Sequence, residues 1–193
     1  MFGASRLIVM FALALMLAAC GDRAGDTAIT SGGVDGIVPV AQVDTDRIKA
    51  AADEPEMWLT YGGTYDEQRH SALGQINRDT LPELGVGWVY ETAKPRGAEA
   101  TPIVVDGVMY VSSAWSVVYA LDAKTGEELW VYDPEVSGKD AAKGCCDVVN
   151  RGVAVYNGRV YFGSLDGRLI ALDAASGEKV WEVDTIIDRD RFY

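Results

Sequence analysis

The stretch ALDAKTGEELW at residues 120–130 returns as ALDAASGEKVW at residues 171–181, and this repetition decides the fold. It extends without a gap over residues 101–133 and 152–184, at a constant offset of 51 positions. Each copy contains short β-rich runs, which in the first copy lie near residues 103–105, 108–113, 117–122 and 128–132. Four antiparallel strands closed by a tryptophan are typical of one β-propeller blade.

The residues inside the repeated stretch have structural explanations. Small alanines leave room for the indole of Trp130, Asp122 and Thr125 can satisfy amides of a turn, and Gly126 can adopt a positive φ before the last strand. We therefore expect these residues, and their counterparts 51 positions later, to be structural and not catalytic. A looser version of the pattern at residues 77–88 predicts the end of an earlier blade.

Turn signals and repeat number predict an open arrangement. Asp106-Gly107 and Asn157-Gly158 separate β-rich runs and suit type I′ hairpins. Two complete repeats do not close a ring, because propellers need roughly four to eight blades. We therefore expect an all-β fold in which residues 44–193 form the first blades of a propeller that continues beyond Tyr193.

The N-terminal residues predict export. Arg6 precedes an apolar run at residues 7–19, which is too short to span a bilayer and reads as a signal peptide, residues 1–19. The sequence LAACG at residues 17–21 resembles a bacterial lipobox, in which Cys20 is lipidated. An ordinary signal peptide with a chance cysteine is the alternative. We expect a periplasmic location with a lipid anchor to the membrane.

The segment after the lipobox predicts a spacer. Residues 20–43 are rich in Gly, Asp and Thr and read as a flexible tether. Asp44 or Thr45 then suits the start of a short helix through about residue 53, and residues 58–63 read as a short strand that ends in a glycine turn.

Charge and ligand types exclude several functions. The formal net charge is −12, and the 17 basic residues are scattered among 29 acidic ones, so a nucleic-acid partner is not expected. His70 is the single histidine, which leaves too few soft ligands for a zinc site. The chain also has no Cys-x-x-Cys-His for attachment of a c-type haem.

Two adjacent cysteines, Cys145 and Cys146, stand in the stretch KGCCDVVNRG at residues 143–152. A disulfide between neighbours closes a strained ring, and such strain clusters at ligand clamps and active sites. Two free thiols, or one cysteine paired elsewhere, are equally compatible with the spacing. If Cys20 carries lipid in an oxidising compartment, no other thiol is available, and pairing between the neighbours is favoured.

The export signal, the tryptophan-closed repeats and GCCDVVNRG together resemble the pyrroloquinoline quinone (PQQ) dependent alcohol dehydrogenases, from about Trp58 to Tyr193. The resemblance implies an eight-bladed periplasmic quinoprotein or quinohaemoprotein. It also implies that the Cys145–Cys146 disulfide packs against one face of PQQ, and that Arg151 and Glu99 bind the cofactor. Under the offset of 51, Glu99 falls on Asn150 and Arg151 on Ala100, so both side chains should share one face near the propeller axis.

The alternatives for these two residues are that Glu99 is a surface residue of the loop containing Lys94-Pro95-Arg96, and that Arg151 pairs with Asp147. The resemblance places the calcium ligands and the general base beyond Tyr193, so no catalytic or metal-binding residue is expected in this chain. It implies oxidation of a small alcohol to an aldehyde, with a periplasmic or membrane electron acceptor.

A rival interpretation is a non-catalytic propeller, because the outer-membrane assembly lipoprotein has a lipobox and similar tryptophan-closed repeats. That protein binds other proteins and does not need paired cysteines. A third interpretation makes the cysteine pair a redox sensor. Cys145 and Cys146 together with Arg151 separate these interpretations and favour the enzyme.

Overall fold

The computed structural model describes residues 41–94, 96–142 and 146–188. The predicted signal peptide, lipidated Cys20, tether residues 20–40 and Cys145 lie outside the described residues. The described residues belong to one compact unit.

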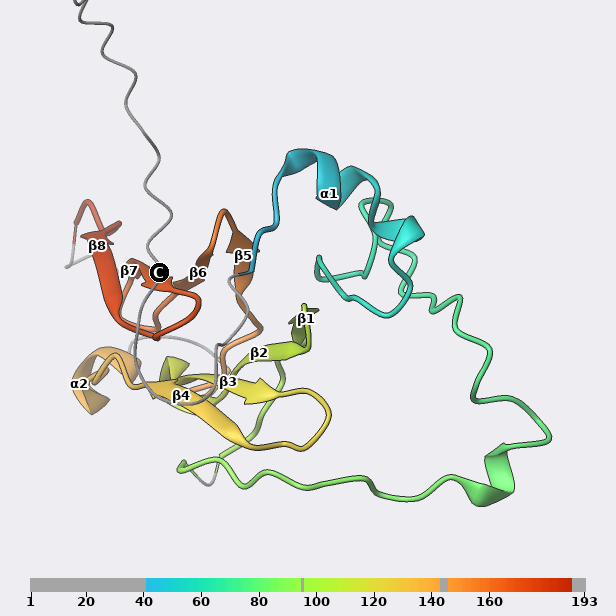
Figure 1. Ribbon diagram of the computed structural model, residues 1–193. Coiled ribbons are helices and arrows are strands. Elements are labelled where there is room, and N and C mark those ends of the chain that lie inside the picture. Colours follow the sequence, from blue (N-terminus) through green and yellow to red (C-terminus); the bar gives the residue numbers. More distant parts are fainter. Residues whose placement is uncertain (1–40, 95, 143–145, 189–193) are drawn as a thin grey trace, which may run out of the picture. The chain divides into compact units, whose positions relative to one another are not determined.

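Two four-stranded antiparallel sheets form the body, each with its strands in chain order (Figure 1). The first consists of β1 (Ile103–Val105), β2 (Val108–Ser112), β3 (Val118–Asp122) and β4 (Glu128–Tyr132). The second consists of β5 (Ala154–Tyr156), β6 (Arg159–Gly163), β7 (Arg168–Asp173) and β8 (Lys179–Asp184). The predicted four strands per repeat are confirmed, and we call these sheets blade 1 and blade 2.

The two blades share one register. Ile103 pairs with Tyr110 in blade 1, as Ala154 pairs with Tyr161 in blade 2. Both blades also shift register at the same repeated alanine, after Ala120 and after Ala171. The offset of 51 in sequence is therefore an offset of one blade in space.

The hairpin turns have the backbone that their residues favour. Asp106 and Gly107 have φ values of 52° and 82°, and Asn157 and Gly158 have 47° and 69°. Positive φ at both central residues is what a type I′ turn requires, and Asp, Asn and Gly adopt it at the lowest cost.

The repeated turn between the third and fourth strands is held by its aspartate. Oδ1 of Asp122 accepts hydrogen bonds from the amide and the hydroxyl of Thr125 at 2.7 and 2.9 Å. Oδ1 of Asp173 accepts the same pair from Ser176 at 2.9 and 3.1 Å. The structural role predicted for these residues is confirmed.

A tryptophan from each repeat packs on the turn of the next. The indole N–H of Trp130 donates to the carbonyl of Ala174 at 3.0 Å, and a Cβ on Gly177 would lie 2.6 Å from the same ring. Trp88 packs on Gly126 with the same 2.6 Å approach, and donates to the carbonyl of Ala123 at 3.3 Å. Trp88 thus closes onto blade 1 as Trp130 closes onto blade 2, which is the packing of a β-propeller-type fold.

The segment before blade 1 differs from its prediction. The expected helix is present as α1 (Thr45–Lys49), capped by Asp44, followed by a 3₁₀ helix at Ala51–Asp53. The expected strand at residues 58–63 is wrong, because Trp58 makes a single antiparallel bridge to Val104 and the chain then turns.

Residues 41–43, which we expected in the tether, belong to the folded unit. Ala41 and Val43 are fully buried, and their carbonyls accept hydrogen bonds from Gly158 and Asn157 at 2.9 and 2.8 Å. Burial of two small apolar side chains and hydrogen bonds from the β5–β6 turn amides therefore fix this part of the segment.

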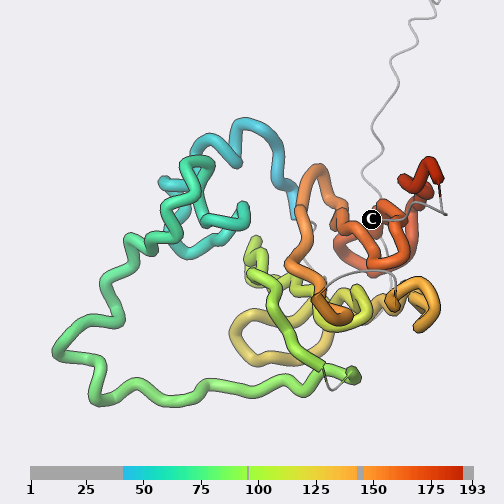
Figure 2. Tube along the Cα trace, turned by 180° about the vertical axis from the view of Figure 1, so that it is seen from behind, coloured from blue at the N-terminus to red at the C-terminus, as the bar shows by residue number. Residues whose placement is uncertain are grey.

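The connection from Trp58 to blade 1 has little regular structure. Among the described residues from 64 to 100 it contains the 3₁₀ helix Leu81–Glu83 and no strand (Figures 1 and 2). The remaining elements are the 3₁₀ helix Ala114–Ser116 between β2 and β3, and the four-residue α2 (Gly138–Ala141) after β4. No helix among the described residues is long and apolar enough to cross a membrane.

Candidate functional site

Glu99 and Arg151 lie together where successive blades begin their first strand. Thr101 and Gly152 form a parallel bridge immediately before β1 and β5. Nη2 of Arg151 lies 3.4 Å from Oε2 of Glu99, and the two side chains are 65% and 50% exposed. The expected proximity is confirmed. Because the pair is exposed and long, it contributes little stability and leaves both groups accessible to a ligand.

The loop before β5 carries the cysteine motif. Cys146 and Asp147 have φ values of 71° and 67°, which non-glycine residues rarely adopt. Cys146 is disulfide-bonded. Cys145 lies outside the described residues, so its pairing with Cys146 stays a prediction. Strained backbone of this kind persists only where surrounding contacts hold it.

One such contact joins Asp147 to Arg96. Nε of Arg96 lies 3.2 Å from Oδ2 of Asp147, and the second guanidinium nitrogen contacts Oδ1. Arg96 therefore lowers the pKa of Asp147 below its ordinary value. The alternative in which Arg151 pairs with Asp147 is wrong, because Arg151 pairs with Glu99 instead.

Asn150 is a residue whose role the sequence analysis missed. Its Oδ1 accepts hydrogen bonds from the Ser112 hydroxyl at 2.6 Å and from the Gly152 amide at 3.1 Å. Its Nδ2 donates to the Ser116 hydroxyl at 3.2 Å and to the Gly163 carbonyl at 2.9 Å. One side chain thus joins the end of β2, the end of β6 and its own loop.

The turn after β2 also supports the cysteine loop. Trp115 and Ser116 have φ values of 63° and 60°, and the Trp115 amide donates to the Val148 carbonyl at 2.8 Å. Trp115 packs with Val148 and with Ala141 of α2. A hollow of about 300 Å³ beside them is also lined by the ion pair Arg96 and Asp147.

Tyr61 and Arg69 place an aromatic ring and a basic group near the start of blade 1. The Arg69 guanidinium lies 4.4 Å from the centre of the Tyr61 ring, a cation–π contact. Hydrogen bonds to Arg69 and Thr101, with a weaker effect of the Arg151 charge, lower the pKa of the phenol. No sequence pattern that we used singled out this pair.

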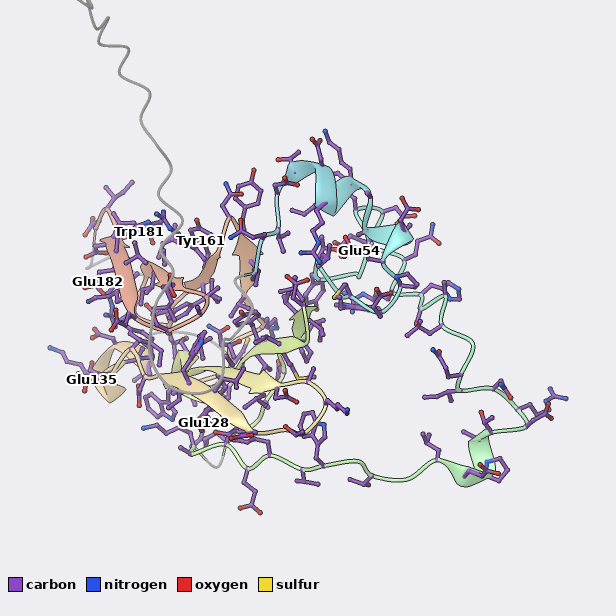
Figure 3. All side chains as sticks on the ribbon, viewed as in Figure 1. Glu54, Glu128, Glu135, Tyr161, Trp181 and Glu182 are labelled. Atoms are coloured by element: carbon purple, nitrogen blue, oxygen red, sulfur yellow. The ribbon has the colours of Figure 1, made fainter. Side chains whose placement is uncertain are left out.

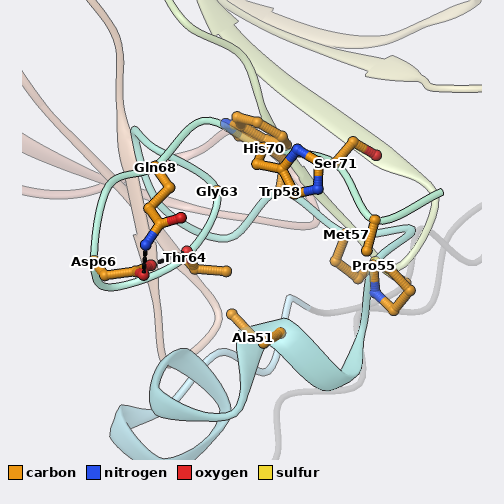
Figure 4. Close-up of a pocket in the computed structure, with 12 residues that line it drawn as sticks. Ala51, Pro55, Met57, Trp58, Gly63, Thr64, Asp66, Gln68, His70 and Ser71 are labelled. Atoms are coloured by element: carbon orange, nitrogen blue, oxygen red, sulfur yellow. Dashed lines mark hydrogen bonds between the residues drawn. The ribbon is translucent and has the colours of Figure 1, made fainter.

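A separate cavity of about 220 Å³ lies against the segment before blade 1 (Figure 4). Trp58 and His70 line it, together with Asp66, which accepts a hydrogen bond from Gln68 at 2.6 Å. None of the predicted cofactor residues lines this cavity. No group of three or more His, Cys, Asp or Glu side chains in the described part of the chain is placed to hold a metal ion.

Residues 58–190 match the family model described as glucose/ethanol/alcohol dehydrogenase, β-propeller domain, with PQQ as its short name. The chain belongs to this family. The match covers both blades, the Glu99–Arg151 pair and the cysteine loop. The predicted resemblance is therefore confirmed.

Individual members of the PQQ family are also similar to this chain. A quinohemoprotein alcohol dehydrogenase of Comamonas testosteroni is 50% identical over 170 residues, which are 88% of this chain and 24% of that protein. The solved structure of quinohemoprotein alcohol dehydrogenase ADHIIG of Pseudomonas putida superposes with a TM-score of 0.78 at 53% identity, covering 81% of this chain and 23% of that one. A europium-containing methanol dehydrogenase gives a TM-score of 0.69 at 39% identity, covering 74% of this chain and 25% of that one.

The chain spans about a fifth to a quarter of the length of the curated relatives it matches. The described part of the chain comprises two blades and the segment before them. Its accessible groups are a guanidinium, a carboxylate and a disulfide-bonded cysteine at one end of adjacent inner strands. Such groups can bind oxygen-rich planar ligands.

Proposed function

We propose that this chain supplies one wall of the PQQ site in a PQQ-dependent dehydrogenase that oxidises a small alcohol to an aldehyde. The observation that carries the proposal is the accessible Arg151–Glu99 pair at the start of adjacent blades, beside the loop of Cys146. The family match and the alcohol dehydrogenases among its relatives support the same activity.

The residues present fit such a cofactor. Arg151 offers a rigid, permanently charged fork for carboxylate or quinone oxygens, and its charge favours a site where negative charge develops. Glu99 can accept hydrogen bonds from ring N–H or hydroxyl groups. A Cys145–Cys146 disulfide would present a flat, polarisable surface to one face of the ring. When bound, PQQ supplies the two-electron chemistry of alcohol oxidation.

The complete protein must supply the remaining groups. We place the general base and the ligands of a calcium ion outside residues 1–193, in an eight-bladed propeller that these two blades begin. The europium-containing relative is in line with a metal-dependent member of the family. A periplasmic or membrane-bound electron acceptor then reoxidises the cofactor.

The export signal and Cys20 lead us to place the enzyme in the periplasm, anchored to a membrane by lipid. Labelled palmitate should be incorporated into the protein in cells, and Cys20→Ser should abolish incorporation. Palmitate labelling that survives the substitution would remove the anchor from the proposal.

The activity is tested on the complete gene product, reconstituted with PQQ and calcium, by dye-linked alcohol oxidation and by PQQ titration. Arg151→Ala and Cys145→Ser should weaken PQQ binding and lower activity. Arg159→Ala removes an exposed arginine beside the β5–β6 turn and serves as the matched control, which should behave as wild type. A wild-type protein that binds no PQQ and oxidises no alcohol would refute the proposal.

A further inference from the structure

We propose that Asn150 is the positioning residue of the PQQ site, which fixes the backbone from which Cys146 and Arg151 project. The inference rests on the proposed function, because it assigns a role toward the same cofactor. It starts from the carboxamide of Asn150, whose two donor and two acceptor positions are all used.

The partners of Asn150 belong to rigid parts of two different blades. Ser112 on β2 and Ser116 in the turn after it are fully buried. Gly163 ends β6 in blade 2. The carboxamide therefore couples blade 1 to blade 2 at the end where their first strands begin. A partly buried polar network in which every hydrogen-bonding position is used favours one geometry.

This coupling acts on Arg151, the next residue in the chain. The Arg151 side chain is 65% exposed, and among the described residues its ion pair is the long 3.4 Å contact with Glu99. Its placement therefore depends on its backbone, which Asn150 fixes by accepting from the Gly152 amide on the far side of Arg151. At the other end of the loop, Arg96 holds Asp147 next to Cys146. Side chains that bind a ligand must be positioned to well under 1 Å, so loosening either end of the cysteine loop should weaken PQQ binding.

Substitutions can separate positioning from packing. Asn150→Asp keeps the size and the acceptor oxygen but loses both donors and faces the Gly163 carbonyl with negative charge. Ser116→Ala removes one partner and leaves Asn150 in place. Ser113→Ala is the matched control, because this neighbouring hydroxyl is 2% exposed and has no hydrogen-bond partner among the described residues.

The experiment titrates the PQQ-free complete protein with PQQ and, separately, measures reduction of the disulfide at Cys146 by a small thiol without PQQ. We expect Asn150→Asp to weaken PQQ binding about tenfold or more, since it loses two hydrogen bonds. Ser116→Ala should weaken PQQ binding about threefold to tenfold. Both variants should speed disulfide reduction, while Ser113→Ala should change neither quantity. Melting temperatures show that the compared proteins are folded.

Each outcome decides the inference. Unchanged PQQ affinity in folded Asn150→Asp overturns it, as does an equal loss in Ser113→Ala. If Asn150→Asp does not fold, Ser112→Ala and Ser116→Ala decide in its place. Ser112→Ala loses one hydrogen bond to Asn150, and Ser116→Ala loses one as well, together with the bond from the Leu165 amide. A wild-type protein that binds no PQQ overturns the proposed function and with it this inference. Wild-type binding with insensitive variants overturns the inference alone.

Discussion

Blade 1 and blade 2 have the same strand register and nearly the same repeated sequence, but their closing side chains differ in burial. In blade 1, Tyr110 is fully buried and Trp130 is 8% exposed, and both donate to the carbonyl of Ala174. In blade 2, Tyr161 and Trp181 are only partly buried (Figure 3). The ring centres are 5.9 Å apart in the first pair and 6.0 Å in the second, so the pair itself is unchanged.

The difference shows what each repeat lacks. A blade forms its own Tyr–Trp pair, but the glycine and the carbonyl that cover the pair come from the next repeat. No described residue accepts a hydrogen bond from the Trp181 indole, and Val180 and Val183 of β8 are 45% and 49% exposed. Stability in such an array is the sum of the repeats and of the contacts between neighbours.

The largest effect is expected from removing the indole between the blades. In the complete gene product, Trp130→Ala should cost about 3–5 kcal/mol of unfolding free energy, because it empties a buried site. Trp130→Phe keeps an aromatic ring and loses the bond to Ala174, and should cost less, with about 1 kcal/mol from that bond. Denaturant unfolding measures both variants. Equal losses of unfolding free energy in the two variants would show that packing of the ring is not the main contribution of Trp130 to stability.

The glycine beneath the indole gives the next largest effect. Gly177 has a φ of 72°, and an added Cβ would lie 2.6 Å from the Trp130 ring. Gly107 has a φ of 82° with open space around it. Gly107→Ala should therefore cost about 1–2 kcal/mol from backbone strain alone, and Gly177→Ala should cost more, because the indole must also move. Similar losses at both positions would contradict the close packing seen between the blades.

The sequence predicted the repeated parts well, because each short-range pattern there agrees with the packing. The β-rich runs, the Asp-Gly and Asn-Gly turns, and the Asp122 and Gly126 roles all depend on neighbours within one repeat or in the adjacent one. The offset of 51 aligns Glu99 with Asn150, the neighbour of Arg151, and so predicted that Glu99 and Arg151 lie close together. The same offset relates Arg96 directly to Asp147, and their complementary charges could have predicted this pair.

Contacts that follow no repeat could not be predicted in this way. The strand expected at residues 58–63 satisfied a local pattern, yet only Trp58 finds a partner strand, at Val104. The network of Asn150 depends on where Ser112 and Gly163 end their strands in two blades. Asn150 belongs to the motif GCCDVVNRG, but its partners do not stand out in sequence, since most serines lie on surfaces or in turns.

A moderate effect is expected where the two hairpin turns differ. Asp106 in blade 1 receives two hydrogen bonds from Arg47, at 2.7 and 3.1 Å, and Arg47 also pairs with Glu54 at 2.7 Å. Asn157, the blade 2 counterpart, has a neutral side chain, and its backbone amide donates to the Val43 carbonyl. Arg47→Met should cost about 1.5–3 kcal/mol, because it leaves two carboxylates close together without their cation. The double variant Arg47→Met, Asp106→Asn should regain part of the loss in the same unfolding measurement.

The smallest effect concerns the turn aspartate of blade 1 and depends on pH. Hydrogen bonds from Thr125 lower the pKa of Asp122 below its ordinary value of 3.8, so the folded state prefers the ionised carboxylate. A group whose pKa is lower in the folded state stabilises fully above its unfolded value and loses that contribution as the pH falls through the folded value. Asp122→Asn should therefore lower the melting temperature slightly at neutral pH and flatten its decline below pH 3.8. Thr125→Val, which removes the hydroxyl donor, should shift the decline toward higher pH. If wild type and Asp122→Asn lose stability in parallel through the acid range, the turn owes its order to Gly126 and the indole above it, and not to the carboxylate.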